Sequence, residues 1–146
     1  MITTEALCEL MPHAGSMCLI QELVSWDKEQ IVCRTRSHLS AQNPLRSGGR
    51  LNAIHAIEYG AQAIGLHGGL LAKQSGENPG SGLLVGLRQI RLHRTRLDDT
   101  TDPLLIHARR LLADSRNLLY AFAIHLNQEP VAEGRAAIIT QQGVES

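Results

Sequence analysis

Glu58 is the residue whose position in this sequence best suits acid–base chemistry. It lies in the one long helical pattern, about Leu51 to Lys73, at the edge of the apolar stripe. A carboxylate in such a place is costly unless it is paired or solvated, and enzymes use this placement to raise a carboxyl pKa. Gln62 lies one turn later and His55 one turn earlier, so we expect Gln62 to orient the carboxylate. The alternative is that Glu58 reaches a loop amide or solvent and has no catalytic role.

The histidines raise the question of a metal centre. None of them lies in an H-E-x-x-H motif or in a Cys/His cluster with ligand spacing, and three lie on separate strand-like runs: His93, His107 and His125. We therefore expect ordinary strand or surface roles for these three, and no metal site.

A group of arginines is the densest basic feature of the chain. It comprises Arg88, Arg91, Arg94 and Arg96 on one strand-like run. Because arginine suits bidentate contact with carboxylate or phosphate, this group is predicted to bind an acidic partner. The alternative is a solvated edge strand, since charge also protects sheet edges.

The composition limits the classes of protein that need to be considered. The 146 residues are 43% hydrophobic and 19% charged, which predicts one soluble globular domain over residues 1–146. Fourteen basic and fourteen acidic residues cancel, so the chain has no bulk field for nucleic acid or for an anionic membrane. Aromatic residues, at 3%, are too few for an RNA-stacking surface.

The cysteines are odd in number and form no C-x-x-C pair: Cys8, Cys18 and Cys33. The polar residues Thr3, Thr4 and Glu5 stand where a secretory signal would be basic and then apolar. The pattern therefore predicts a reduced, cytoplasmic protein whose thiols are small buried hydrophobes.

The elements that position these residues follow from hydrophobic periodicity. A short helix capped by Thr3 or Thr4 is followed by a strand hairpin, the long helix and an antiparallel meander. The predicted strands are residues 17–26, 30–38, 83–97, 104–112, 118–126 and 131–140. This order indicates an α+β fold, with a long central helix wrapped by an antiparallel sheet of five to six strands.

The long helix has two further features. Its apolar stripe, which we expect to face the sheet, comprises Ile54, Ile57, Ala61, Ile64 and Gly68. Its interior glycines indicate that another backbone comes close, because glycine is costly inside a helix: Gly60, Gly65, Gly68 and Gly69. Its polar residues favour a buried helix over a membrane span.

Three segments resemble 3-hydroxyacyl-acyl-carrier-protein dehydratases of the FabZ/FabA type, which have the hotdog fold. Residues 10–20 resemble their L-P-H-R-x-P-F-L-L-V-D opening, residues 57–63 their helix motif I-E-A-x-A-Q, and residues 86–94 their strand G-x-x-x-x-R-F-R-R. The forms P-H-A-G-S-M-C-L-I, N-P-L-R and E-Y-x-A-Q-A-x-x-x-H-G are more similar still to the dehydratase-like proteins of aryl-polyene biosynthesis clusters. His13, Asn43 and His67 match that branch.

The resemblance implies dehydration of an acyl chain bound to an acyl carrier protein. The substrate itself would carry the phosphopantetheine arm, so no cofactor is expected. Glu58 takes the position of the family's catalytic acid, and the carrier would meet the arginine group. The implied substrate-binding residues are His13, Asn43, Gly48, Gly49, Gln62 and His67, with a backbone N–H near the two glycines polarising the thioester carbonyl. Hotdog relatives pair edge to edge, so a homodimer, or a heterodimer with another hotdog protein, is expected.

One departure from the family leaves the activity open. The family's catalytic histidine lies fourteen residues before the helix acid, where this chain has Pro44 next to Asn43. Asn43 can hold a carbonyl or a water but cannot take a proton, so His38 is the candidate for the second catalytic group. Two alternatives follow: a non-catalytic hotdog subunit that pairs with an active dehydratase, or a hotdog acyl thioesterase. The loop of the form Asn-x-x-x-x-Gly-Gly supports the thioesterase.

Overall fold

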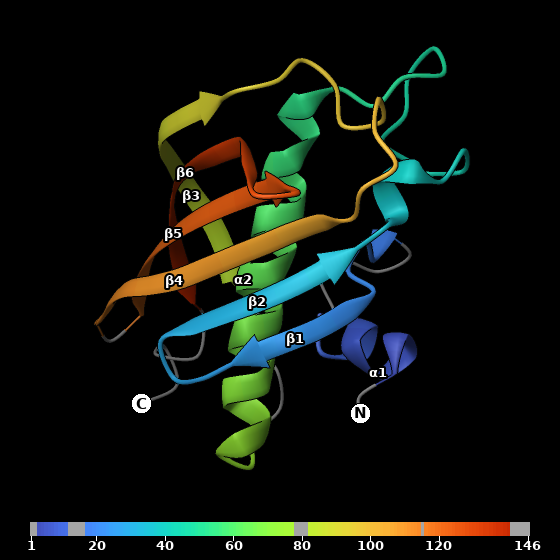
Figure 1. Cartoon of the computed structure of the whole chain (residues 1–146). Coiled ribbons are helices and arrows are strands. Elements are labelled where there is room, and N and C mark those ends of the chain that lie inside the picture. Colours follow the sequence, from blue (N-terminus) through green and yellow to red (C-terminus); the bar gives the residue numbers. More distant parts are fainter. Residues whose placement is uncertain (1–2, 12–16, 78–81, 115, 141–146) are drawn as a thin grey trace.

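The chain folds as one helix held in a curved sheet (Figure 1). The computed structural model describes residues 3–11, 17–77, 82–114 and 116–140. The elements in chain order are α1 (Thr4–Glu9), β1 (Glu22–Trp26), β2 (Gln30–Thr35), the 3-10 turns η2 (Ser37–Leu39) and η3 (Ala53–His55), α2 (Ala56–Gln74), β3 (Gly82–Leu92), β4 (Leu104–Asp114), β5 (Asn117–Leu126) and β6 (Glu129–Thr140). This confirms the predicted α+β architecture.

The strands form one antiparallel sheet in the order β1-β2-β4-β5-β6-β3. The meander comprises β4, β5 and β6, whereas β3 pairs with β6 at the far edge. The connection from β3 to β4 therefore passes over the end at which α2 begins (Figure 1). That connection brings residues 93–103 close to the loop before the helix, which the sequence pattern did not predict.

Three predicted strands are shorter in the structure. The strand predicted over 30–38 ends at Thr35, because Ser37–Leu39 form the 3-10 turn η2. The first strand starts at Glu22 instead of Met17, because the backbone of Leu19 is bonded to side chains. Its N–H donates to Gln62 and its carbonyl accepts from Thr35 and Ser37. The strand predicted over 83–97 ends at Leu92. After one further bond, from the His93 N–H to the Val131 carbonyl, the backbone of Thr95 and Leu97 pairs instead with Ala53 and Leu51 before α2.

The predicted buried face of the long helix is wrong. Ile54 is 47% exposed and Gly68 is exposed. The face that meets the sheet instead carries Ala56, Tyr59, Ala63, Leu66 and Leu70. The two faces are similarly apolar, and the buried one includes polar groups that find partners inside the molecule, so periodicity favoured the isoleucine stripe. Of the predicted stripe, Ile64 is buried and Ile57 packs against the core, so only its two ends, Ile54 in η3 and Gly68 in α2, are exposed in the single chain.

Two of the helix glycines permit a close approach, as predicted. A Cβ on Gly60 would lie 2.7 Å from the ring of Phe122, and one on Gly69 would collide with the carbonyl oxygen of Leu10. A Cβ on Gly68 would meet nothing within 4 Å. Gly69 thus brings the end of α1 onto α2. Among the described residues, no helix has both the length and the apolar character needed to cross a membrane.

The prediction of three buried thiols is also wrong. Cys8 and Cys18 form a disulfide and are half-buried, whereas Cys33 is free and fully buried. Burial raises the pKa of the Cys33 thiol to about 12. Only Cys33 therefore behaves as the small buried hydrophobe that we expected. The spacing of Cys8 and Cys18 alone gave no sign that α1 folds back beside residue 18.

Candidate functional site

Glu58 lies in the first turn of α2 and is half-buried. Its Oε2 accepts a hydrogen bond from Nε2 of Gln62 at 3.0 Å. A carboxylate near a helix N-terminus is favoured by the unpaired N–H groups there. The carboxyl group is thus held by one fixed donor and remains open to a ligand.

Gln62 is fully buried, and its amide orientation follows from its partners. The Oε1 atom accepts from the Leu19 N–H at 2.8 Å, and Nε2 donates to the Met17 carbonyl at 2.6 Å. The second hydrogen on Nε2 is the one that reaches Glu58. A flipped amide would set its NH2 group against the Leu19 N–H and its oxygen against the Met17 carbonyl and the Glu58 carboxylate, so the donor that faces Glu58 is fixed. The predicted contact between Gln62 and Glu58 is present, whereas its catalytic value stays a prediction.

Asn43 uses both hydrogens of its amide nitrogen, and its amide oxygen, in hydrogen bonds within the protein. Its Nδ2 donates to the Ser37 carbonyl at 2.9 Å and to the Tyr59 hydroxyl at 3.0 Å, while its Oδ1 accepts from the Leu45 N–H at 2.9 Å. The Tyr59 hydroxyl also contacts Ser37 Oγ, and burial raises the Tyr59 pKa, so this phenol stays protonated. The arrangement fits the loop-holding half of the prediction for Asn43, and its role toward substrate stays a prediction.

His38, the candidate second catalytic group, is fully buried in η2. Its Nε2 lies 2.8 Å from the carbonyl oxygen of Asp102, so Nε2 carries the proton and donates. Its Nδ1 is buried without a partner in the described structure. Burial lowers the His38 pKa, and the positive charges of Arg36 and Arg46 lower it further. His38 is therefore a neutral, enclosed imidazole, and its catalytic role stays a prediction.

Arg46 is an anchor of this loop that the sequence analysis missed. Its guanidinium donates to the carbonyls of Ser40, Gly49 and His38, and it reaches the Asp98 carboxylate at 3.0 Å. Asp98 also accepts two hydrogen bonds from Arg96, which hold the pKa of that carboxyl well below its usual range. The ion pairs tie the loop before α2 to the connection between β3 and β4. The two arginines followed by two aspartates within residues 94–99 were the available signal.

Gly48 and Gly49 form a tight turn rather than the start of the helix. Both have positive φ, at 59° and 76°, where glycine is favoured. They connect Ser47 and Arg50, whose backbones pair at 2.8 and 3.0 Å. Because η3 separates this exposed turn from α2, the N–H groups of the two glycines are not those of the helix N-terminus. Their predicted role in binding substrate stays a prediction.

His67 lies at the other end of α2, about 13 Å along the axis from Glu58. Its Nε2 donates to the Asp27 carbonyl at 2.7 Å, and its Nδ1 accepts from the Tyr120 hydroxyl. Burial lowers the His67 pKa, which keeps the ring neutral. His67 braces the β1–β2 turn and does not reach Glu58. His13, the other predicted histidine, lies outside the described residues.

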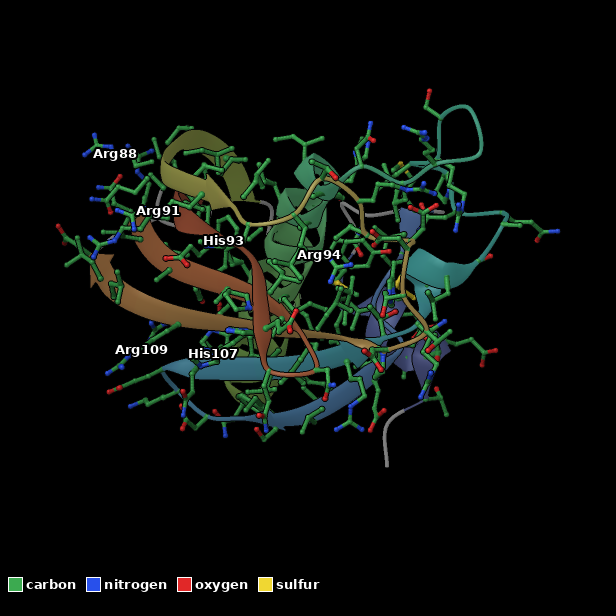
Figure 2. All side chains as sticks on the ribbon, turned by 45° about the horizontal axis from the view of Figure 1, so that its top comes forward. Arg88, Arg91, His93, Arg94, His107 and Arg109 are labelled. Carbon is green, nitrogen blue, oxygen red and sulfur yellow. A yellow bond between two sulfur atoms is a disulfide. The ribbon has the colours of Figure 1, made fainter. Side chains whose placement is uncertain are left out.

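The four predicted carrier-binding arginines do not form one patch. Arg94 and Arg96 lie beyond β3 and pair with Asp99 and Asp98 at 2.6 and 2.9 Å. Arg88 and Arg91 lie on β3 itself, and Arg94 is well separated from them (Figure 2). The prediction of a single group is therefore wrong, because two of the four arginines form ion pairs with aspartates in the loop after β3.

A row of arginines replaces that group on the convex face of the sheet. Arg88 is paired with Arg135, Arg135 with Ala121, and Ala121 with Arg109. Their neighbours in sequence, such as Tyr120 and Ala136, are buried beneath α2, so the arginines project away from the helix. Like charges directly opposite each other are destabilising in a sheet, which makes this row a candidate for binding acidic groups.

Within the described part of the chain, no three His, Cys, Asp or Glu side chains converge as metal ligands would. The site therefore rests on Glu58 and its buried amide partner. One helix wrapped by an antiparallel sheet, with Glu and Gln one turn apart at the helix edge, is the arrangement that the resemblance to hotdog-fold dehydratases leads us to expect.

The family model of ApeP-like proteins, described as ApeP dehydratase, matches residues 5–146. The chain belongs to this ApeP-like dehydratase family. A search of curated proteins found no match.

Solved structures share the fold. The dehydratase heterocomplex ApeI:P from Xenorhabdus doucetiae matches with a TM-score of 0.82 and 24% identity, covering 95% of this chain and 93% of that one. The PaaI protein of E. coli, from the phenylacetic acid degradation operon, matches with a TM-score of 0.65 and 16% identity, covering 92% of each chain. A hypothetical thioesterase with coenzyme A from Streptococcus pneumoniae matches with a TM-score of 0.61 and 14% identity, over 82% of this chain and 84% of that one. These likenesses establish the hotdog fold.

Proposed function

We propose that this chain dehydrates 3-hydroxyacyl thioesters on an acyl carrier protein, as one subunit of an assembly with a second hotdog chain. The observation that carries the proposal is the half-buried Glu58 carboxyl, held by the fixed N–H of Gln62 at the open edge of α2. Membership of a dehydratase family gives the reaction class.

In this reaction a proton leaves C2 of the acyl chain, the C3–O bond breaks, and the hydroxyl departs as water after gaining a proton. Glu58 suits the second task, because a carboxyl group at the edge of a buried face can give a proton to a leaving oxygen. The electron pair left at C2 forms the new double bond. A substrate that carries its own phosphopantetheine arm needs no further cofactor.

Removal of the C2 proton needs a base besides Glu58, and neither His38 nor His67 is suited to that role. His38 is enclosed and neutral, and His67 is bonded at both nitrogens. We therefore assign the base to another hotdog subunit. The match to a structure named as a dehydratase heterocomplex supports this assignment.

The surface of the chain supports such an assembly. Ile54, in the 3-10 turn η3 before α2, is 47% exposed, and the edge strand β3 exposes Leu84, Val85 and Leu87 at 40–51%. Unpaired strand edges and apolar patches of this kind are typical of subunit interfaces. Light scattering at micromolar concentration should give a dimer or, with the second chain, a heteromer. A monomer that no hotdog partner converts would contradict the proposal.

The acidic carrier protein is proposed to meet the arginines of β3 and its neighbour β6. Arg88→Glu together with Arg135→Glu should slow carrier association about tenfold and flatten its dependence on salt. Arg50→Glu, an exposed arginine in the loop before α2, is the matched control and should leave association unchanged. Equal association of the double variant and wild type would make the row a solvated sheet face.

Mass spectrometry of a 3-hydroxyacyl carrier protein tests the proposed reaction. The carrier is incubated with the chain alone and with candidate hotdog partners. Loss of water from the acyl chain is the expected result. Loss of the whole acyl group would indicate a thioesterase instead, and no change under any condition would indicate a non-catalytic subunit.

A further inference from the structure

The Cys8–Cys18 disulfide joins α1 to the segment that precedes β1. Both cysteines are half-buried, so neither is enclosed in the core. The third cysteine, Cys33, is fully buried on the sheet and is not part of this pair.

Cys18 lies between the two residues whose backbones bind Gln62. The Met17 carbonyl accepts from the Gln62 amide at 2.6 Å, and the Leu19 N–H donates to it at 2.8 Å. The same amide donates to Glu58 at 3.0 Å. The disulfide is therefore one residue away from both contacts that fix the amide facing Glu58.

The other end of the disulfide is firmly anchored. Leu7 and Met11, on either side of Cys8, are fully buried in the core. The carbonyl of Leu10 lies against Gly69 of α2, where a methyl group has no space. Because α1 is held in the core, the disulfide also restrains the position of residues 17–19.

We propose that the Cys8–Cys18 disulfide is a redox-sensitive tie that holds residues 17–19 on Gln62 and so positions Glu58. A dithiol reductant opens it in two exchanges. A reductant thiolate attacks one sulfur and breaks the S–S bond, and the second reductant thiol then displaces the protein sulfur from the mixed disulfide. Two electrons pass to the protein, both cysteines end as thiols after gaining two protons, and the reductant ends as its own disulfide.

Opening the tie makes local release of residues 17–19 easier, because the closed loop restricts the open states of that segment. When these residues leave, Gln62 loses the donor and the acceptor that fix its orientation. Glu58 then loses its fixed donor, and poorly positioned catalytic groups transfer protons slowly. The effect on Gln62 is independent of the enzyme's reaction, whereas a consequence for turnover rests on the proposed function.

Amide hydrogen exchange of Leu19 tests the tie without any assay of activity. Wild-type protein is compared before and after treatment with dithiothreitol, with free thiols counted by alkylation and mass. Leu19 exchange should accelerate at least about tenfold on reduction, within the roughly hundredfold that closing a loop of this size can contribute. An unchanged rate, or alkylation of Cys8 and Cys18 before reduction, would overturn the proposal.

Two variants complete the design. Cys8→Ser with Cys18→Ser should exchange Leu19 as fast as reduced wild type and should not respond to dithiothreitol. Cys33→Ala is the matched control, because it removes a thiol outside the pair and should keep the response of wild type. A response that persists in the double variant would contradict the tie. If the reaction proposed above fails but reduction still releases Leu19, the tie stands and only its link to turnover is lost.

Discussion

Two polar side chains of α2, Glu58 in its first turn and His67 in its second half, differ in burial and in how many of their hydrogen-bonding atoms are already bonded. Near its start, Glu58 is half-buried and accepts one hydrogen bond from a fixed amide. Near its end, His67 is fully buried, with both ring nitrogens bonded, to the Asp27 carbonyl and the Tyr120 hydroxyl. The family pattern marks both positions, yet only the first retains capacity for a ligand. Glu58 thus has unused hydrogen-bonding capacity at an accessible edge, as a group that contacts substrate needs, whereas His67 uses both nitrogens to hold neighbouring elements together.

The largest expected effect is on turnover at the start of the helix. Glu58→Gln keeps the size of the side chain and removes the titrating group. Turnover by the assembled protein should fall by about 10² to 10⁴, the usual contribution of general acid or base catalysis. Thermal unfolding should be unchanged. Full activity in this variant would remove Glu58 from the mechanism.

The second effect is on stability at the end of the helix. His67→Leu leaves the Tyr120 hydroxyl and the Asp27 carbonyl without their buried partner. The free energy of unfolding should fall by about 2–4 kcal/mol, as is typical when a buried hydrogen-bond network is broken. Urea denaturation measures this, and turnover per folded molecule should persist. A stable but inactive variant would place His67 in the site after all.

A third effect separates two neighbouring glycines of the same helix. Gly69→Ala pushes a methyl group into the Leu10 carbonyl and should cost about 1–3 kcal/mol, because backbone cannot move aside cheaply. Gly68→Ala is the matched control, since a Cβ there meets nothing within 4 Å. It should stabilise the isolated chain by roughly 0.5–1 kcal/mol through helix propensity. Equal melting temperatures would show that α1 does not rest on Gly69.

The smallest effect is a pH dependence of stability. Burial and the nearby Arg110 lower the His67 pKa, whereas the Asp27 carboxylate acts in the opposite direction. The unfolded chain therefore binds this proton more readily. The stabilisation is complete above the unfolded pKa of about 6.5 and is lost as the pH falls below it, by at most about 1.4 kcal/mol per pH unit. His67→Leu should show a shallower slope than wild type in urea titrations. Parallel slopes would mean that folding does not lower the pKa of His67.

Much of the fold was predictable because long elements have strong periods. The order of helix and strands, the Thr3 cap and the hairpin turn follow from local sequence. The buried face of α2 could not be predicted in this way, because it includes the polar residues Tyr59, Gln62 and His67. These side chains can be buried only because they form hydrogen bonds to residues far away in the sequence. The place of β3 at the sheet edge is equally non-local.

The candidate site was predictable where one helix turn contains it. Glu58 and Gln62 are four residues apart, so the contact between them follows from helix geometry. The Met17 and Leu19 partners of Gln62, the Arg46–Asp98 pair and the Cys8–Cys18 disulfide join separate segments. Local patterns do not contain such pairings, and for the cysteines the odd count favoured free thiols.

Hydration in heavy-oxygen water tests most directly whether Glu58 performs dehydration chemistry. A carrier-bound 2-enoyl chain is incubated in this water with the assembled wild-type protein or with the Glu58→Gln variant. The mass of the intact acyl carrier protein is then measured by mass spectrometry. Because dehydration is reversible, wild type should place the heavy oxygen in a new hydroxyl on the acyl chain, and the variant should not. Label appearing equally fast with the variant, or only in a released acid, would contradict the assignment of Glu58 as the dehydratase acid.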